Sequence, residues 1–239
     1  IPTATPTSSV LGSKNADYCL QEYWESRFSD EEEYDWLLSY SDIEPSLSPL
    51  LDEYCVVLGK RRDTLNTLIV GCGNSSFSAG LYDAGFTSLT NIDFSSVVIE
   101  NMAKAHAVDR PAMRWLCMDM LDMTFKNEVF DVVIDKATMD ALMVAEVDSW
   151  APSDEVKIKS RQYCSEVSRV MKPRGLFYMI SFQQPHFRTK YLADCVGQTS
   201  PYSATTGHCA SFQWTLEEPS TVRAEKGSLD YFAYTMRAD

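Results

Sequence analysis

A set of glycine and aspartate residues is spaced in a way that suits the binding of a nucleoside. Gly71 and Gly73 lie in LIVGCGNSSFS, directly after a short apolar run. Asp93, Asp119 and Asp135 each close a later apolar run. Ligands bind beyond the carboxyl ends of the strands in an open parallel sheet, so we expect these residues to line one crevice. Asp also ends strands because it suits turns, but three such residues beside a glycine turn favour a binding site.

The glycine turn lacks one feature of a dinucleotide-binding loop. The third glycine of such loops, which allows close helix–strand packing, is replaced here by Ser76. The segment 65–103 also contains no Lys, Arg or His, although it contains Asp83 and Glu100. A pyrophosphate would find no basic side chain there. A ligand with a ribose, a positive charge and no phosphate, such as S-adenosylmethionine, suits this composition better.

Each acidic residue has an expected contact with that ligand. Asp93 lies about twenty residues after the glycine turn, where an acid accepts hydrogen bonds from the ribose hydroxyls. Asp119 is expected to accept a hydrogen bond from the adenine amino group. Phe94 and Met120 follow these acids and are candidates to pack on the adenine ring, although core packing explains their apolar side chains equally well.

Short apolar runs bounded by turn residues predict the strands that position these groups. The runs alternate with helical patterns, which indicates a mostly parallel α/β sheet. We expect strands at Thr67–Gly71, Leu89–Asp93, Met113–Asp119, Phe130–Asp135, Gly175–Ser181, Ser211–Leu216 and Tyr231–Met236. We expect helices at Ser76–Ala84, Ser95–Ala107 and Ile158–Met171. The last two strands are predicted to form an antiparallel hairpin that closes the sheet.

The chain divides into three zones. Residues 1–15 are rich in Pro, Ser and Thr and are predicted to form a flexible tail. Residues 16–63 are predicted to form a helical cap with many aromatic side chains, and residues 64–239 contain the predicted sheet. Aromatic rings attract a sulfonium through cation–π contacts and exclude water. For any single ring in this zone, core packing is the more common explanation.

Composition limits the cellular compartment and the class of partner. No apolar run reaches the roughly 18–20 residues of a membrane span, and the N-terminal stretch lacks the pattern of a signal peptide. Seven cysteines without a Cys-x-x-Cys pair argue against a disulfide framework or a zinc site, so we expect a cytoplasmic protein without a metal. The net charge of −13 disfavours nucleic acid and favours a basic protein or a small molecule, although solubility alone also explains it.

Several sequence blocks together resemble the class I S-adenosylmethionine-dependent methyltransferases. The blocks are EYWESRF, YDWLLSYSDI, LIVGCGNSSFS, NIDFSSVVIENM, WLCMDMLDMTFKNEVFDVVIDKATMDALM, SEVSRVMKPRGLFYMIS and QPHFRTKY. Within that class, GCGNS, DFSSVVI and PHFR resemble the methyltransferase-like branch that includes elongation factor 1-alpha lysine methyltransferases. The resemblance implies a Rossmann-like methyltransferase sheet of seven strands, parallel except for a C-terminal antiparallel hairpin strand, beneath an N-terminal helical cap.

The resemblance also implies which residues form the site. Those expected to bind S-adenosylmethionine are Trp24, Phe28, Trp36, Gly71, Gly73, Asp93, Phe94, Asp119, Met120 and Lys136. Phe28 stands where the family often has Tyr, so a hydroxyl contact is lost there. His186, Phe187 and Arg188 are candidate substrate contacts, with a structural turn as the alternative for His186.

The resemblance implies methyl transfer to a lysine of a basic protein such as elongation factor 1-alpha. A lysine ammonium has an ordinary pKa of about 10.4 and must lose its proton before it can accept a methyl group. Asp135 is the first candidate to orient that ammonium, and Asp140 is the second. Three alternatives stay open: a small-molecule methyltransferase, a cofactor-binding scaffold without turnover, and a nicotinamide oxidoreductase, which the glycine turn disfavours.

Overall fold

The computed structural model describes residues 15–144, 152–193, 212–224 and 229–238. Nearly all of the predicted tail, residues 1–15, therefore lies outside the described residues. Within the described ranges, no helix is both long enough and apolar enough to cross a membrane.

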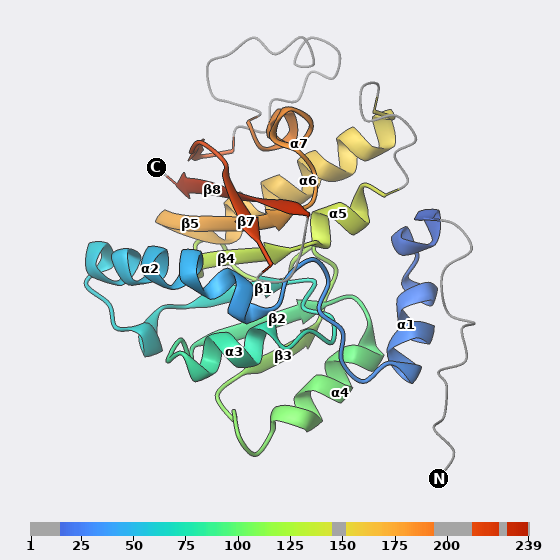
Figure 1. Ribbon diagram of the computed structural model, residues 1–239, viewed down its shortest axis with the longest axis horizontal. Coiled ribbons are helices and arrows are strands. Elements are labelled where there is room, and N and C mark those ends of the chain that lie inside the picture. Colours follow the sequence, from blue (N-terminus) through green and yellow to red (C-terminus); the bar gives the residue numbers. More distant parts are fainter. Residues whose placement is uncertain (1–14, 145–151, 194–211, 225–228, 239) are drawn as a thin grey trace.

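A mostly parallel sheet forms the centre of the molecule (Figure 1). Its strands lie in the order β3-β2-β1-β4-β5-β8-β6, and β7 also pairs with β8. The first five strands, which are all parallel, are β1 (Thr67–Val70), β2 (Leu89–Asp93), β3 (Arg114–Cys117), β4 (Phe130–Lys136) and β5 (Met171–Ser181). The chain order reverses between β1 and β4, which is where such sheets bind ligands.

The antiparallel edge has one more strand than the sequence predicts. β6 (Trp214–Leu216) and β7 (Ser220–Arg223) pair with successive parts of β8 (Asp230–Ala238), on the edge of β8 that faces away from β5. They share one position in the sheet, so the eight strands of the described residues fill seven positions. Pro219 lies between them and has no N–H to donate, so the ladder is interrupted at that point. The predicted antiparallel pairing of the last two runs is confirmed for Trp214–Leu216. Ser211, the first residue of the predicted run, lies outside the described residues.

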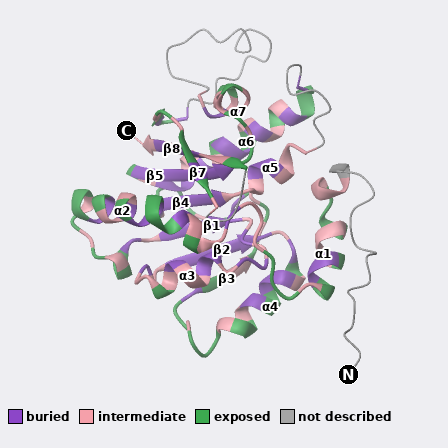
Figure 2. Ribbon diagram, viewed as in Figure 1, coloured by how far each residue is buried: buried purple, intermediate pink, exposed green. Residues whose placement is uncertain are grey.

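Helices cover both faces of the sheet, and the strands between them are mostly buried (Figure 2). The buried side chains of the strands divide between two core clusters, one on each face. One face carries α2 (Tyr40–Leu58), α3 (Phe77–Asp83) and α4 (Ser96–His106). The other carries α5 (Thr138–Leu142), α6 (Asp154–Val170) and α7 (Pro185–Leu192). In β1, Ile69 faces the first set while Leu68 and Val70 face the second.

The bounds of α4 and α6 can be compared with those predicted from the sequence. Ser95 caps α4 as expected, because its hydroxyl accepts a hydrogen bond from the Val98 N–H. α6 begins earlier than predicted, after Ser153, which caps it through Val156. It ends at Val170, and β5 starts at the next residue instead of at Gly175.

The two halves of the N-terminal segment lie in different parts of the molecule. The 3-10 helix η1 (Asn15–Cys19) and α1 (Gln21–Asp30) lie beyond the carboxyl ends of the parallel strands, at the right of Figure 1. By contrast, α2 packs on the sheet, and η2 (Arg62–Thr64) leads into β1. Within the predicted cap, residues 16–63, the part before α2 therefore covers the strand ends.

Candidate active site

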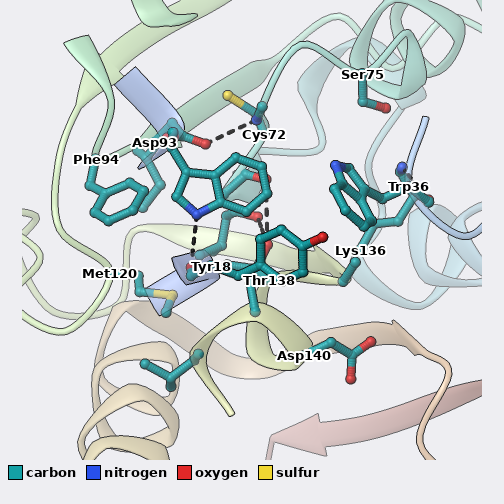
Figure 3. Close-up of a pocket in the computed structure, with 18 of the residues that line it drawn as sticks. Tyr18, Trp36, Cys72, Ser75, Asp93, Phe94, Met120, Lys136, Thr138 and Asp140 are labelled. Carbon is teal, nitrogen blue, oxygen red and sulfur yellow. Dashed lines mark hydrogen bonds between the residues drawn. The ribbon is translucent and has the colours of Figure 1, made fainter. Parts of the chain in front are cut away.

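A pocket of about 630 Å³ lies at the carboxyl ends of β1, β2 and β4 (Figure 3). This volume is in the range that holds a small-molecule cofactor. The lining includes the glycine turn, the segments that follow β2, β3 and β4, residues of η1 and α1, and the loop between α1 and α2. Lys159 of α6 and Phe182, which follows β5, also line it. Asp93, Phe94 and Met120 lie on one side, and Trp36 and Lys136 lie on the other (Figure 3).

The glycine turn forms the floor of the pocket. Gly71 and Gly73 have φ values of +57° and +52°, a region that favours glycine. A Cβ on Gly71 would lie 2.4 Å from atoms of the Thr138 side chain, so a larger residue has no space there. The Thr138 hydroxyl in turn donates to the Val70 carbonyl at 2.8 Å. The turn therefore brings the backbone of β1 against the start of α5.

Asp93 is buried at the end of β2 and contacts the glycine turn. Its two carboxylate oxygens accept hydrogen bonds from the N–H groups of Gly73 and Ser95, each at 3.0 Å. Burial raises the pKa of Asp93 to about 6, although both N–H groups act to lower it. Each oxygen keeps acceptor capacity, so the carboxylate can still accept hydrogen bonds from a diol in the pocket.

The structure also places Asp119 in the pocket lining, but not at a strand end. β3 ends at Cys117, so Asp119 is an exposed loop residue and the predicted strand Met113–Asp119 is too long at both ends. Its carboxylate accepts a hydrogen bond from the Leu121 N–H at 2.8 Å, which fixes the turn. Phe94 and Met120 are half-buried and line the pocket beside the two acids.

Aromatic side chains from the N-terminal segment cover the glycine turn. Trp24 stacks on Phe28 with 5.4 Å between ring centroids, and it meets Trp36 edge-on at 5.9 Å. The indole N–H of Trp24 donates to the Tyr18 carbonyl at 2.8 Å. The Phe28 ring would lie 3.6 Å from a Cβ on Gly73, so it packs directly over the turn. The three predicted aromatic residues are thus brought together at the pocket.

Two charged residues that the sequence analysis did not single out hold this cap together. Arg27 is buried among the rings, with its guanidinium 4.8 Å from the Trp36 ring centroid, and it pairs with Glu31 at 2.8 Å. Asp35 accepts hydrogen bonds from the hydroxyls of Ser75 and Ser76. Both residues lie in the motifs that carry the family resemblance, EYWESRF and YDW. From these motifs, the sequence predicts only the aromatic neighbours as site residues.

Lys136 connects β4 to the same cap through its side chain. Its ammonium donates to the Trp36 carbonyl at 2.9 Å and lies 3.5 Å from the Asp35 carboxylate. Burial lowers the pKa of Lys136, while the nearby Asp35 acts to raise it. The Asp35 carboxylate therefore joins the glycine turn, β4 and the cap at one point.

The structure places Asp135 outside the pocket lining. A group that orients the methyl acceptor would have to face the pocket. Asp135 is 0% exposed and does not contribute to the pocket lining. Its oxygens accept hydrogen bonds from the N–H groups at the start of α5 and from the Tyr163 hydroxyl at 2.8 Å. Burial raises its pKa to about 6, against the effect of the Tyr163 hydrogen bond. The carboxylate holds α5 in place from behind the pocket wall.

The candidate substrate residues on α7 are also placed differently from the expectation. Arg188 is 1% exposed and forms a buried ion pair with Asp140, which lines the pocket. The Asp140 carboxylate also accepts from the Ser181 hydroxyl at 2.6 Å. His186 is exposed and Phe187 is half-buried, with ring centroids 3.8 Å apart, and neither lines the pocket. Arg188 therefore lies behind the pocket lining, where it holds Asp140 in place.

Comparison with known proteins identifies the family. Residues 68–179 match a family model described as a methyltransferase domain. EEF1A lysine methyltransferase 4 of Bos taurus is 35% identical over 216 residues, which are 88% of this chain and 80% of that protein. The chain belongs to the S-adenosylmethionine-dependent methyltransferases. The eEF1A lysine and N-terminal methyltransferase of Homo sapiens is 32% identical to this methyltransferase over 185 residues, which are 76% of this chain and 24% of that protein.

Solved structures agree with the fold. The N-methyltransferase NodS from Bradyrhizobium japonicum WM9, in complex with S-adenosyl-L-homocysteine, aligns with a TM-score of 0.57 at 16% identity. The alignment covers 91% of this methyltransferase and 97% of that chain. At this identity the likeness concerns the fold alone.

The pocket of this methyltransferase suits its methyl donor, S-adenosylmethionine. Among the described lining residues, the basic ones are Lys136 and Lys159, and both pair with acids, Asp35 and Glu155 respectively. Among the described lining residues, every basic side chain is therefore already paired with an acid, which disfavours the binding of a pyrophosphate. The pocket does offer carboxylates for hydroxyl and amino groups and aromatic rings for a sulfonium.

Proposed function

We propose that this enzyme methylates a lysine side chain of a basic protein, and that the acceptor is elongation factor 1-alpha. The observation that carries the proposal is the 35% identity to EEF1A lysine methyltransferase 4 over 80% of that protein's length. The net charge of −13 suits a basic acceptor. A translation factor as substrate, together with seven cysteines that need no disulfide framework, suits a cytoplasmic enzyme.

The proposed donor contacts follow from the positions of the side chains. We assign Asp93 to the ribose hydroxyls and Asp119 to the adenine amino group, with Phe94 and Met120 against the adenine ring. The remaining donor contacts come from the floor, β4 and the cap. They are Gly71, Gly73, Lys136, Trp24, Phe28 and Trp36. The bound donor supplies a methyl group activated by its sulfonium.

The protein's main task in this reaction is to position and desolvate the acceptor amine. Methyl transfer from a good leaving group depends chiefly on alignment of the reacting atoms. Asp135 and Asp140 are both engaged by other protein groups, so neither carboxylate is poised to take a proton from lysine. We propose that desolvation in the aromatic-lined pocket lowers the pKa of the ammonium and releases its proton to solvent.

Labelling of a cell lysate with tritiated S-adenosylmethionine tests the substrate class. We expect label in a protein band at the position of elongation factor 1-alpha, and a much weaker band with the Asp93→Ala variant. Label confined to small molecules would instead indicate a small-molecule methyltransferase. A lysate without any enzyme-dependent label would indicate a binding scaffold without turnover.

A further inference from the structure

The strand order indicates which end of the pocket receives the methyl acceptor. Asp93 ends β2 and Asp119 follows β3, so the nucleoside of the donor belongs on that side of β1. β4 and β5 lie on the other side of β1, and Trp36 and Lys136 are found there (Figure 3). The acceptor must approach opposite the nucleoside, and it therefore enters beside the ends of β4 and β5.

Phe182 is placed at this entrance. It directly follows Ser181, the last residue of β5, and it lines the pocket. The residue is nevertheless 52% exposed, although a benzyl group of this size gains stability from burial. Single exposed apolar residues are common on protein surfaces, as Val108 beyond α4 illustrates. Phe182 differs from Val108 because it lines a functional cavity.

Hydrogen bonds hold the backbone at Phe182 and Gln183, so the point from which the exposed ring projects is fixed. The Phe182 N–H donates to Asp140 at 3.2 Å, and the Gln183 N–H donates to the Ser181 hydroxyl at 3.0 Å. The same Asp140 carboxylate is anchored by the buried Arg188. The Tyr234 hydroxyl donates to the Gln183 carbonyl from β8. A rigid anchor beneath an exposed ring is the arrangement expected of a preorganised contact site.

We propose that Phe182 is a specificity residue that contacts the methyl acceptor. Its ring covers the aliphatic stem of the incoming lysine and attracts the ammonium before the proton is lost. The inference rests on the proposed function, because a lysine is what the ring would contact. It assigns the acceptor contact to the residue after β5, instead of to the His186–Arg188 segment of α7.

Steady-state kinetics with elongation factor 1-alpha test this role, with donor affinity measured separately by calorimetry. For Phe182→Ala we expect kcat/KM for the protein acceptor to fall about tenfold, while the Kd for S-adenosylmethionine stays within about twofold. Phe182→Tyr keeps the ring and should recover most of the lost kcat/KM. Val108→Ala removes an exposed apolar side chain outside the pocket and should match the wild type.

The possible outcomes separate the inference from the proposed function. Methyl transfer by the wild type with an unchanged kcat/KM in Phe182→Ala would overturn the role of Phe182 and leave the proposed function in place. A weakened donor Kd would overturn it too, because the ring would then belong to the cofactor site. A wild-type enzyme that methylates no lysine would refute the proposed function and this inference together.

Discussion

At the end of β2, burial raises the pKa of Asp93 to about 6. The charged form is the better acceptor for ribose hydroxyls. The carboxylate is ionised above pH 6 and protonated below it, so donor affinity should be constant above about pH 7. It should then fall by up to about tenfold per pH unit below pH 6, because the donor competes with a proton. Calorimetric titration with S-adenosylmethionine across this range checks the prediction.

Two substitutions at Asp93 separate its charge from the rest of the site. Asp93→Asn should remove the acidic fall in affinity, since the side chain no longer titrates. Asp93→Ala should weaken donor binding by about 1–3 kcal/mol, the usual loss for hydrogen bonds to a charged group. Asp83→Ala removes an acid that pairs with Arg110 outside the pocket, and it should leave affinity unchanged. Equal affinities in Asp93→Ala and the wild type would refute the assignment to the ribose.

Asp135 should matter mainly for stability. Asp135→Ala leaves the Tyr163 hydroxyl and two N–H groups of α5 without their partner, so we expect a loss of about 2–4 kcal/mol in the free energy of unfolding. Urea denaturation measures this loss. Asp63→Ala, in an exposed pair with Arg61, should have little effect. A stable Asp135→Ala variant that binds donor normally and has lost turnover would contradict the structural role.

The contrast between Asp93 and Asp135 shows what the sequence could not predict. Both acids close an apolar run, so the sequence treats them alike. In the structure Asp93 is the last residue of β2 and contacts the glycine turn, whereas Asp135 is followed by Lys136, which completes β4. Successive strand residues point to opposite faces of a sheet. The last residue of each of these two strands faces the pocket, so the pocket side chain is Asp93 in β2 but Lys136, and not Asp135, in β4.

At the scale of elements, the N-terminal cap is fastened to the glycine turn and to β4 through Asp35. Asp35→Ala removes the acceptor of the Ser75 and Ser76 hydroxyls and the acidic partner of Lys136, so we expect donor to dissociate about tenfold faster. Stopped-flow measurement of donor release checks the rate. Hydrogen exchange should show weaker protection in α1. Glu32→Ala, an exposed acid in the same loop, is the matched control, and an equal rate in both variants would refute the role of Asp35.

Strands and helices with strong local signals were predicted well, and residues held by tertiary contacts were not. The strand Leu89–Asp93 and the cap Ser95 were confirmed, because an apolar run and a capping hydroxyl are local features. β7 lies in a segment without an apolar run, and it forms because the edge of β8 has unpaired groups to satisfy. The buried pair of Arg188 and Asp140 joins residues 48 positions apart, a contact that no local pattern contains.

At the scale of the whole molecule, the acidic charge should govern association with the acceptor. The net charge of −13 attracts a basic protein electrostatically. Salt screens this attraction and shortens its range. We therefore expect KM for elongation factor 1-alpha to rise several-fold between about 50 and about 300 mM salt, since the Debye length falls over this range. The Kd for S-adenosylmethionine in the same buffers is the control and should change little. A KM that does not depend on salt would contradict electrostatic attraction.

Mass spectrometry of purified elongation factor 1-alpha tests the central claim most directly. The factor is incubated with S-adenosylmethionine and either the wild-type enzyme or the Asp93→Ala variant, and its peptides are then sequenced. The account predicts that the wild type adds methyl groups to a lysine side chain and that the variant adds far fewer at the same enzyme concentration. Unmodified lysines with an enzyme that binds S-adenosylmethionine normally would contradict the account.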